Sequence, residues 1–245
     1  RDRREEGPLA LRPTGRGGYA GAFAEFSEFE FDSEPGVPVN VRWLTPKDRK
    51  GEVPLVVWIK GPGDSVTFPD LDEFFPLLRT HAMAILSPRF SERPLSGSEH
   101  ARLERTAGLA GRSLASQWVW DILRTADWAV RDRKIGFSEI AVCGRGPAGI
   151  AGLYAALFEP RIGRVILRDP PVSHFEGPAL PMILRETDID EVAAALAPRR
   201  LTILSRLPKE FPLARAAYAL EGVPEALGQA DSLAQALSAG KEPRC

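Results

Sequence analysis

The chain has 245 residues and a mass of 26.8 kDa, and its residues are 44% hydrophobic and 27% charged. This composition suits one large globular domain or two small ones and excludes a collagen-like, coiled-coil or disordered chain. The 32 basic and 33 acidic residues leave a net charge of −1, so the chain lacks a basic surface for a phosphate backbone, and we expect no nucleic-acid partner. Its apolar stretches fall far short of the roughly 20 residues of a membrane-spanning helix, so we expect no membrane association.

The cysteines and the N-terminal residues are the features of the sequence that relate to its cellular compartment. Cys143 and Cys245 have neither the number nor the spacing of a disulfide framework, a redox pair or a metal site, and we expect no metal and no cofactor. Residues 1–18 are charged and then glycine-rich, without the apolar core of a signal peptide, and the first residue is Arg1. We interpret the chain as a soluble mature or excised domain, with secretion or a periplasmic location left open, and residues 1–20 as a flexible lead-in.

The first half of the chain predicts a hairpin followed by parallel strands. Apolar residues recur over 23–31 and alternate over 37–43 on either side of Ser-Glu-Pro-Gly, the pattern of two antiparallel strands and a turn. The apolar run Val53–Ile59 and a shorter run over 82–86 are typical of strands covered on both faces. Residues 69–79 have the leucines and phenylalanines of a short helix, which is the crossover that two parallel strands require.

The second half alternates between helices and strands. The segment 88–112 is rich in Arg, Ser, Pro and Gly without a clear period, so we predict a long surface loop there. The predicted helices cover 114–131, 148–157, 189–196, 211–220 and 232–237, and the predicted strands cover 137–143, 164–167, 201–204 and, weakly, 224–227. We therefore predict an α/β fold in a single domain over 21–245, with a mainly parallel sheet, an N-terminal antiparallel hairpin and helices on both faces.

A glycine-rich turn after the predicted strand 137–143 is the most informative stretch. Gly144, Gly146 and Gly149 match the G-x-G-x-x-G pattern of a dinucleotide-binding turn, and Asp169 lies at a suitable distance for a ribose hydroxyl. In that fold, however, the turn follows the first strand of its unit, whereas three strands and a long helix come earlier here. The alternative is the strand-turn-helix elbow that carries a nucleophile in α/β-hydrolases, and the chain order favours it.

Four short motifs in a fixed order add to this interpretation. They are Lys60-Gly61-Pro62-Gly63, Trp120-Asp121-Ile122-Leu123-Arg124 with Asp127-Trp128, the elbow 144–149 with Leu153-Tyr154-Ala155-Ala156, and Leu196-Ala197-Pro198-Arg199-Arg200-Leu201. With them the chain, over residues 24–240, resembles the acetyl xylan esterase and dienelactone hydrolase branch of the α/β-hydrolases. The resemblance implies esterase chemistry, an oxyanion loop that contains Gly61, Gly63 and Asp64, and a nucleophile elbow formed by Arg145, Gly146 and Pro147.

The residues at these positions do not supply that chemistry. Gly146 occupies the nucleophile position of G-x-S-x-G and has no side chain to attack an ester. The next residue would lend a backbone N–H to the oxyanion hole, a donor worth about 3 kcal/mol, but Pro147 has none. Ser-Arg-Leu follows 201–204, where the acid is expected, and no histidine follows His174. The sequence therefore predicts a degenerate triad.

An alternative catalytic site uses residues that follow another predicted strand. Asp169 and His174 lie just beyond the strand 164–167, where sites form in such sheets. With a serine they could perform acid-base chemistry. The serines that we consider are Ser87, Ser91 and Ser173. The simpler interpretation is that Asp169 begins a turn and that His174 is partly exposed in a loop.

The remaining polar and aromatic residues have simpler interpretations. Arg145 could hold a carboxylate or a sugar hydroxyl, or form an ion pair with Asp64 in the opposite loop. We expect His81 and His100 at the surface and Cys143 in the core. Trp118, Trp120 and Trp128 have helical spacing, so we expect them to pack in the core rather than to bind a sugar.

Three functional hypotheses follow. The first is a catalytically degenerate α/β-hydrolase domain that acts as a binding or structural module for a carbohydrate or a small ester, with an active partner domain or a second copy as its partner. The second is an active esterase with its site at Asp169 and His174. The third is a dinucleotide-binding domain that uses Gly144, Gly146 and Gly149.

Overall fold

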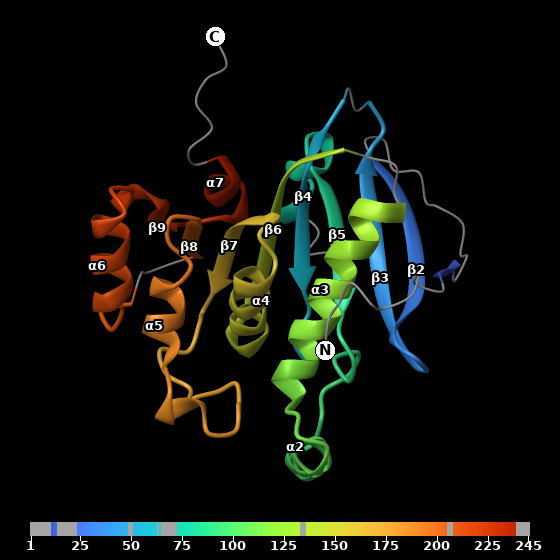
Figure 1. Ribbon diagram of the computed structural model, residues 1–245. Helices are drawn as coiled ribbons and strands as arrows, with labels where there is room; N and C mark the ends of the chain where they lie inside the picture. Colours follow the sequence, from blue (N-terminus) through green and yellow to red (C-terminus); the bar gives the residue numbers. More distant parts are fainter. Residues whose placement is uncertain are drawn as a thin grey trace.

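A single sheet with helices on both sides organises the chain (Figure 1). The computed structural model describes residues 11–13, 24–48, 51–62, 64, 73–132, 136–204 and 208–238. Its strands are β1 (Leu11–Pro13), β2 (Ala24–Glu34), β3 (Val37–Pro46), β4 (Val53–Ile59), β5 (Ala82–Ser87), β6 (Phe137–Arg145), β7 (Ile162–Arg168), β8 (Arg200–Leu204) and β9 (Leu227–Ala230). They lie in the order β1-β2-β3-β5-β4-β6-β7-β8-β9.

The direction of the strands changes at β5. The pairs β1–β2, β2–β3 and β3–β5 are antiparallel, and the pairs from β5–β4 to β8–β9 are parallel. The predicted mainly parallel sheet with an N-terminal hairpin is therefore confirmed. The strand β4 has the predicted bounds, because each of its residues but one is buried and only an apolar run can occupy such a position.

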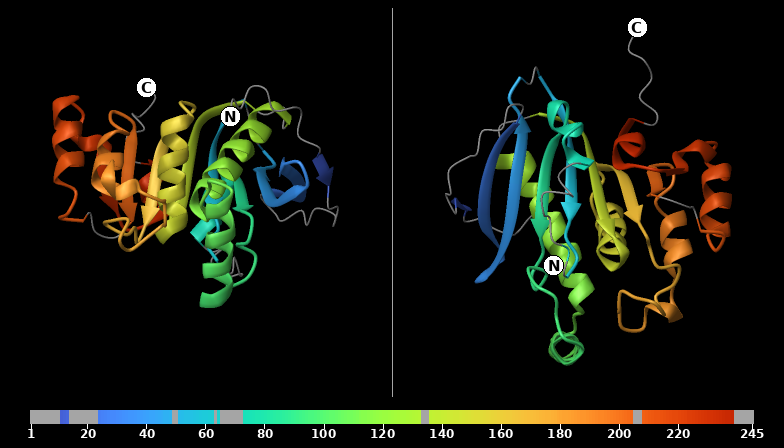
Figure 2. Two further views of the ribbon diagram at one scale, coloured as in Figure 1. Left: turned by 60° about the horizontal axis from the view of Figure 1, so that its bottom comes forward. Right: turned by 180° about the vertical axis from the view of Figure 1, so that it is seen from behind.

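The helices divide between the two faces of the sheet. They are α2 (Gly97–Leu109), α3 (Leu114–Asp132), α4 (Gly146–Phe158), α5 (Ile189–Ala194), α6 (Pro212–Leu220) and α7 (Leu233–Ser238), with the short 3-10 helices η2 (Leu77–Arg79), η3 (Ile183–Arg185) and η4 (Pro224–Ala226). The buried residues of α3, α4, α5 and α6 pack with one face, and those of η2 and α7 pack with the other (Figures 1 and 2). None of the helices in the described part of the chain is long and apolar enough to cross a membrane.

Side chains along β2 and β3 alternate between the two faces of the sheet, and this alternation determines which of them are in the core. Phe31, Val41 and Trp43 are almost fully buried on the face that α3 covers. The Trp128 ring of α3 lies 6.0 Å from the Phe31 ring and 5.3 Å from the Trp43 ring, measured between centroids. Because successive strand residues point to opposite faces, Asn40 and its polar neighbours point to the other face of the sheet.

The predicted loop over 88–112 is wrong in its second half, where α2 lies. Its N-terminus has a capping box: Ser96 Oγ accepts a hydrogen bond from the Glu99 N–H at 3.3 Å, and a Glu99 carboxylate oxygen accepts one from the Ser96 N–H at 2.9 Å. Of its residues only Ala107 is buried. A helix with so small a buried face leaves no apolar period in the sequence.

Several other predictions need correction. The last strand begins at Leu227, later than predicted, because η4 occupies 224–226. His81 is buried rather than at the surface, because it directly precedes the buried strand β5, and its Nδ1 lies 2.8 Å from Thr80 Oγ1. Within the predicted helix 69–79, the described part contains η2. Residues 11–13 of the predicted lead-in pair with β2, and the rest of the lead-in lies outside the described residues.

Candidate functional site

The elbow between β6 and α4 is where the nucleophile of an α/β-hydrolase would lie. Gly146 begins α4 with a φ of +52°, in the left-handed region that glycine adopts at little cost. A Cβ atom built there has its nearest heavy atom, the Asp169 carbonyl oxygen, 4.0 Å away. The elbow thus keeps both the strained geometry and the space for a nucleophile, but it lacks the side chain.

Gly144 and Gly149 have a packing role. A Cβ atom on Gly144 would lie 2.7 Å from the Gly149 nitrogen, and one on Gly149 would lie 2.6 Å from the Gly144 carbonyl oxygen. Both contacts are with backbone, so neither could relax without moving α4 away from β6. Two of the three glycines of the G-x-G-x-x-G pattern are therefore explained by the close approach of strand and helix, without a bound dinucleotide.

The loop after β4 offers no free oxyanion donor within its described residues. The Lys60 N–H donates a hydrogen bond to the Leu86 carbonyl oxygen at 3.0 Å, and the Gly61 N–H donates one to Asp64 Oδ2 at 2.8 Å. Pro62 has no N–H. The Asp64 N–H in turn bonds the Gly61 carbonyl oxygen at 3.1 Å, while Gly63 lies outside the described residues. A carboxylate in this loop would also repel the negative charge of an oxyanion.

Arg145 forms an ion pair with Asp169 rather than with Asp64. Arg145 Nε lies 3.0 Å from Asp169 Oδ2, and more than half of each side chain is exposed. The pair forms because β6 and β7 are parallel neighbours that end together, with Arg145 opposite Arg168. Such an exposed pair contributes about 0–1 kcal/mol. Arg145 can therefore exchange Asp169 for a ligand at little cost.

His174 is buried, not partly exposed, and both of its ring nitrogens have partners. Nδ1 lies 2.9 Å from the Pro178 carbonyl oxygen, and Nε2 lies 2.9 Å from the Tyr154 hydroxyl oxygen. A carbonyl oxygen only accepts, so Nδ1 donates, and in the neutral ring Nε2 accepts a hydrogen bond from Tyr154. The histidine thus attaches the segment 169–188 to α4, and the predicted Asp169–His174 pairing remains a prediction.

The groups around His174 support this structural role. The His174 N–H donates to Asp188 Oδ1 at 2.8 Å. Burial alone would raise the pKa of Asp188, but hydrogen bonds from Ser173 and from the N–H groups of His174 and Ile189 lower it. Burial raises the pKa of Tyr154 to about 12, with a smaller effect of the Asp188 charge. Tyr154 therefore remains a neutral hydrogen-bond donor to His174 at physiological pH.

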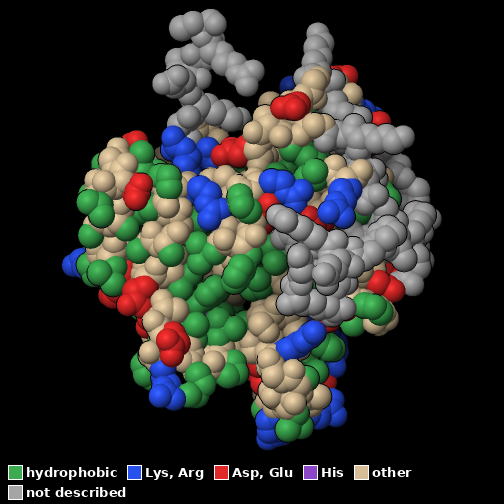
Figure 3. Space-filling view, viewed as in Figure 1, with side chains coloured by type: hydrophobic (Ala, Val, Ile, Leu, Met, Phe, Trp, Pro, Cys, Tyr) green, Lys and Arg blue, Asp and Glu red, His purple; other side chains and the backbone are tan. Residues whose placement is uncertain are grey.

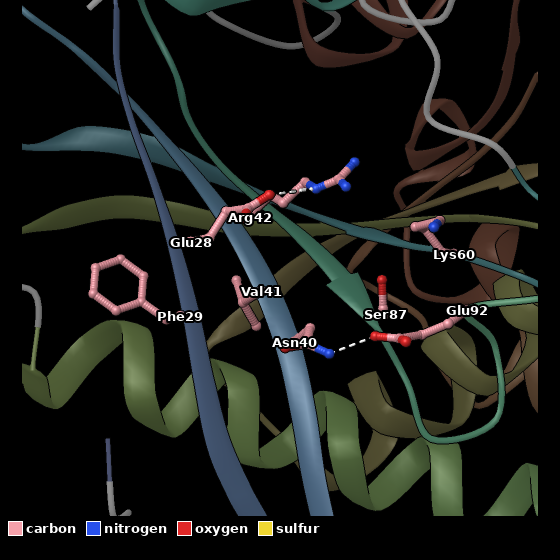
Figure 4. A pocket seen from close by; sticks show the side chains of 8 residues that line it. All are labelled: Glu28, Phe29, Asn40, Val41, Arg42, Lys60, Ser87 and Glu92. Carbon is pink, nitrogen blue, oxygen red and sulfur yellow. Dashed lines mark hydrogen bonds and ion pairs between the residues drawn. The ribbon is translucent and has the colours of Figure 1, made fainter. Parts of the chain in front are cut away.

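The three serines considered for the alternative site lie in different surroundings. Ser91 is fully buried, and its hydroxyl donates to the Pro88 carbonyl oxygen at 2.7 Å. Ser173 bonds Asp188 and accepts from the Phe175 N–H at 3.2 Å. Ser87 ends β5 and lines a polar groove (Figure 4).

A buried charged cluster that was not predicted from the sequence lies where β2, α3 and the segment after β5 meet. The fully buried Asp121 carboxylate accepts from Arg89 Nη2 at 2.6 Å, from Arg89 Nε at 3.0 Å and from Ser33 Oγ at 2.6 Å. Arg89 Nη1 also lies 2.9 Å from Glu34 Oε2. Burial alone would lower the pKa of Arg89, but these two carboxylates raise it. An aspartate within the apolar face of a predicted helix was the signal that could have revealed this cluster.

The described residues include no group of three or more His, Cys, Asp or Glu side chains that could hold a metal ion. The expectation that the chain uses no cofactor therefore remains a prediction, since ligands to organic cofactors need no such group.

Comparison with known proteins identifies the fold. No protein-family model matches the sequence, and no curated protein is significantly similar to it. A solved structure of a candidate acetyl xylan esterase from Bacteroides fragilis NCTC 9343 has a TM-score of 0.74 at 15% identity, covering 94% of this chain and 71% of that one. This chain has the α/β-hydrolase fold. The elbow between β6 and α4 is thus the position at which that fold carries its nucleophile.

Two further structures agree with this assignment. The acetyl xylan esterase from Paenibacillus sp. R4 has a TM-score of 0.60 at 17% identity, covering 91% of this chain and 81% of that one. The glucuronoyl esterase from Solibacter usitatus has a TM-score of 0.63 at 12% identity, covering 91% of this chain and 76% of that one. The predicted resemblance is confirmed for the fold, and at these identities the likeness does not extend to activity.

Proposed function

We propose that this chain is a catalytically inactive α/β-hydrolase domain of carbohydrate-esterase type that acts as a binding module. The observation that carries the proposal is the elbow itself. Gly146 supplies no nucleophile, Pro147 supplies no oxyanion donor, and the described N–H groups of the loop after β4 are already bonded. Nucleophile, base and oxyanion hole act as a unit in ester hydrolysis, so a site without the nucleophile and the oxyanion donors is not expected to hydrolyse an ester.

The packing of the elbow accounts for its shape without catalysis. Gly144 and Gly149 hold β6 against α4, whose buried side chains belong to the core on this side of the sheet, and apolar side chains gather on the face of the molecule viewed in Figure 3. Any change that separated them would disturb the core. The fold can therefore persist after its chemistry has been lost, with a carbohydrate as the proposed ligand because acetyl xylan and glucuronoyl esterases share this fold. An active domain or a second copy is the proposed partner.

Hydrolysis of p-nitrophenyl acetate tests the proposal. The wild type should hydrolyse the ester no faster than a protein-free blank. Gly146→Ser should not gain activity, because a hydroxyl alone restores neither the base nor the oxyanion donor. Gly146→Ala is the matched control, since it introduces the same backbone strain without a hydroxyl.

Two results would overturn the proposal. A wild-type rate clearly above the blank that is lost in His174→Ala would support the alternative site at Asp169 and His174. A rate above the blank that survives both the His174 and the Gly146 substitutions would place a catalytic site elsewhere. Titration with NAD in the same preparation tests the dinucleotide hypothesis, which predicts saturable binding.

A further inference from the structure

A groove with polar and apolar walls lies on the face of the sheet that α3 and α4 do not cover. One part, of about 300 Å³, is lined by Glu28, Phe29, Asn40, Val41, Arg42, Lys60, Ser87 and Glu92 (Figure 4). A second part, of about 780 Å³, shares Asn40, Ser87 and Glu92 with the first and extends past Phe90. These volumes are in the usual range of small-molecule sites.

The register of four strands builds the floor of this groove. Glu30 on β2 lies opposite Asn40 on β3, and Asn40 lies opposite Ser87 on β5. Lys60 directly follows β4, whose last residue, Ile59, lies opposite Leu86, so Lys60 continues the row next to Ser87. Four polar side chains thus cross the sheet in one row, at a place where the described helices leave the strands open (Figure 2).

Two of the polar groups in the groove keep their hydrogen-bonding capacity among the residues that the structure describes. Arg42 Nε lies 3.0 Å from Glu28 Oε1, and the Asn40 side-chain amide donates to Glu92. In the described part of the chain, by contrast, neither the Lys60 ammonium nor the Ser87 hydroxyl makes a hydrogen bond or an ion pair (Figure 4). Burial, and to a lesser extent the nearby Arg42 charge, lowers the pKa of Lys60. Hydrogen-bonding capacity is therefore available at adjacent positions.

The charges of the smaller part cancel, which bears on the class of ligand. Its two cations, Arg42 and Lys60, face two carboxylates, Glu28 and Glu92. No net field selects an ion, but the groups offer donors and acceptors side by side. A hydroxyl group both donates and accepts, so a polyhydroxylated ligand can use both kinds.

Phe90 adds an apolar surface to the larger part. It is 48% exposed, and its φ of +63° is in the left-handed region that non-glycine residues rarely adopt. Strained residues of this kind gather at ligand sites. A sugar ring has an apolar C–H face, and burying that face against an aromatic ring is favourable. The larger part of the groove can therefore contact the C–H face of a sugar, while the smaller part can bind its hydroxyl groups.

We propose that this groove binds a neutral saccharide, with its hydroxyl groups on Lys60 and Ser87 and a ring face on Phe90. The inference rests on the proposed binding function and assigns it to the row across β2, β3, β5 and β4, which ends at Lys60 beside the elbow, since Ile59 lies opposite Gly144. It does not require the elbow to be inactive, so the esterase assay and a binding assay can fail independently.

Saturation-transfer difference NMR with the full chain tests this site. The probes are D-xylose, xylobiose and D-glucuronate at millimolar concentrations. The two neutral sugars should receive saturation and show saturable binding. Lys60→Met and Ser87→Ala should each weaken that binding about three- to tenfold, the effect of losing one hydrogen bond.

Lys209→Met is the matched control, because Lys209 is exposed and outside the groove. It should bind the sugars as the wild type does, and thermal melts should show that all variants are folded. The absence of transfer to either neutral sugar would overturn the proposal. Unchanged binding in both groove variants, or saturable binding of glucuronate alone, would overturn it as well.

Discussion

Substitution of Arg89 by alanine gives the sharpest test of what stabilises this fold. The Asp121 carboxylate is fully buried, and Arg89 supplies its only cationic donors within 3.2 Å among the described residues, through Nε and Nη2. In Arg89→Ala the Arg89 backbone N–H and Ser33 Oγ can still donate, but the charge has no counterion. Each lost charge-assisted hydrogen bond is worth about 1.5–3 kcal/mol. A buried charge left without its partner costs about 3–5 kcal/mol, so the free energy of unfolding should fall by that amount.

Urea denaturation followed by tryptophan fluorescence measures this effect. Trp118 Nε1 donates to the Arg89 carbonyl oxygen at 2.9 Å, so the probe lies beside the change. With a urea dependence of about 2 kcal/mol per molar, a loss of 4 kcal/mol lowers the midpoint by about 2 M. Arg93→Ala is the matched control, because the Arg93 side chain is 65% exposed in its pair with Glu99, and it should cost less than about 1 kcal/mol.

A double substitution separates the ion pair from general damage to the core. Asp121→Ala removes the carboxylate that Arg89→Ala leaves without a counterion. The loss of unfolding free energy in the double variant should therefore be smaller than the sum of the losses in the two single variants. A loss below about 1 kcal/mol in Arg89→Ala would contradict the stabilising role of the Arg89–Asp121 pair. Full additivity in the double variant would also refute it, since it would show that the two side chains do not act on each other.

Two further substitutions test the elbow and the His174 contact. Gly144→Ala places a Cβ atom 2.7 Å from a backbone nitrogen and should lower the free energy of unfolding by about 1–3 kcal/mol. The control Gly108→Ala has open space around its Cβ atom and should raise the free energy of unfolding by about 0.5–1 kcal/mol. Equal urea midpoints for the two variants would contradict this prediction. Tyr154→Phe should remove the absorbance change at 295 nm near pH 12, since the raised pKa of Tyr154 keeps its phenol protonated. Because the pKa of Tyr154 in the folded chain exceeds the value of about 10 in an unfolded chain, the contribution of the neutral phenol to the free energy of unfolding is complete below pH 10 and is lost as pH rises toward 12. A wild-type phenol titration that is complete by pH 11 would contradict this.

The hydrophobic pattern was sufficient for most of the fold. Val53–Ile59 has the same bounds in the sequence prediction and in β4, because a strand covered on both faces needs an apolar residue at nearly every position. The pattern failed at α2, whose capping box at Ser96 and Glu99 stabilises a helix that buries almost nothing. A segment without a buried face leaves no periodic signal, although the capping motif was present.

The residues at the nucleophile and oxyanion positions of the elbow could be read from the sequence for a different reason. That Gly146 has no side chain and Pro147 no N–H are covalent facts, which no tertiary structure can change. The bonding of the Gly61 N–H to Asp64 was not predictable, because it depends on how one loop turns.

Long-range pairing was decided by the tertiary structure alone. Arg89 and Asp121 are 32 residues apart, and neither position shows its partner in the sequence. The row of Asn40, Ser87 and Lys60 exists only because β3, β5 and β4 align in one register. Local patterns report burial along one element, whereas a site is made where several elements meet, and that meeting depends on the packing of the whole sheet.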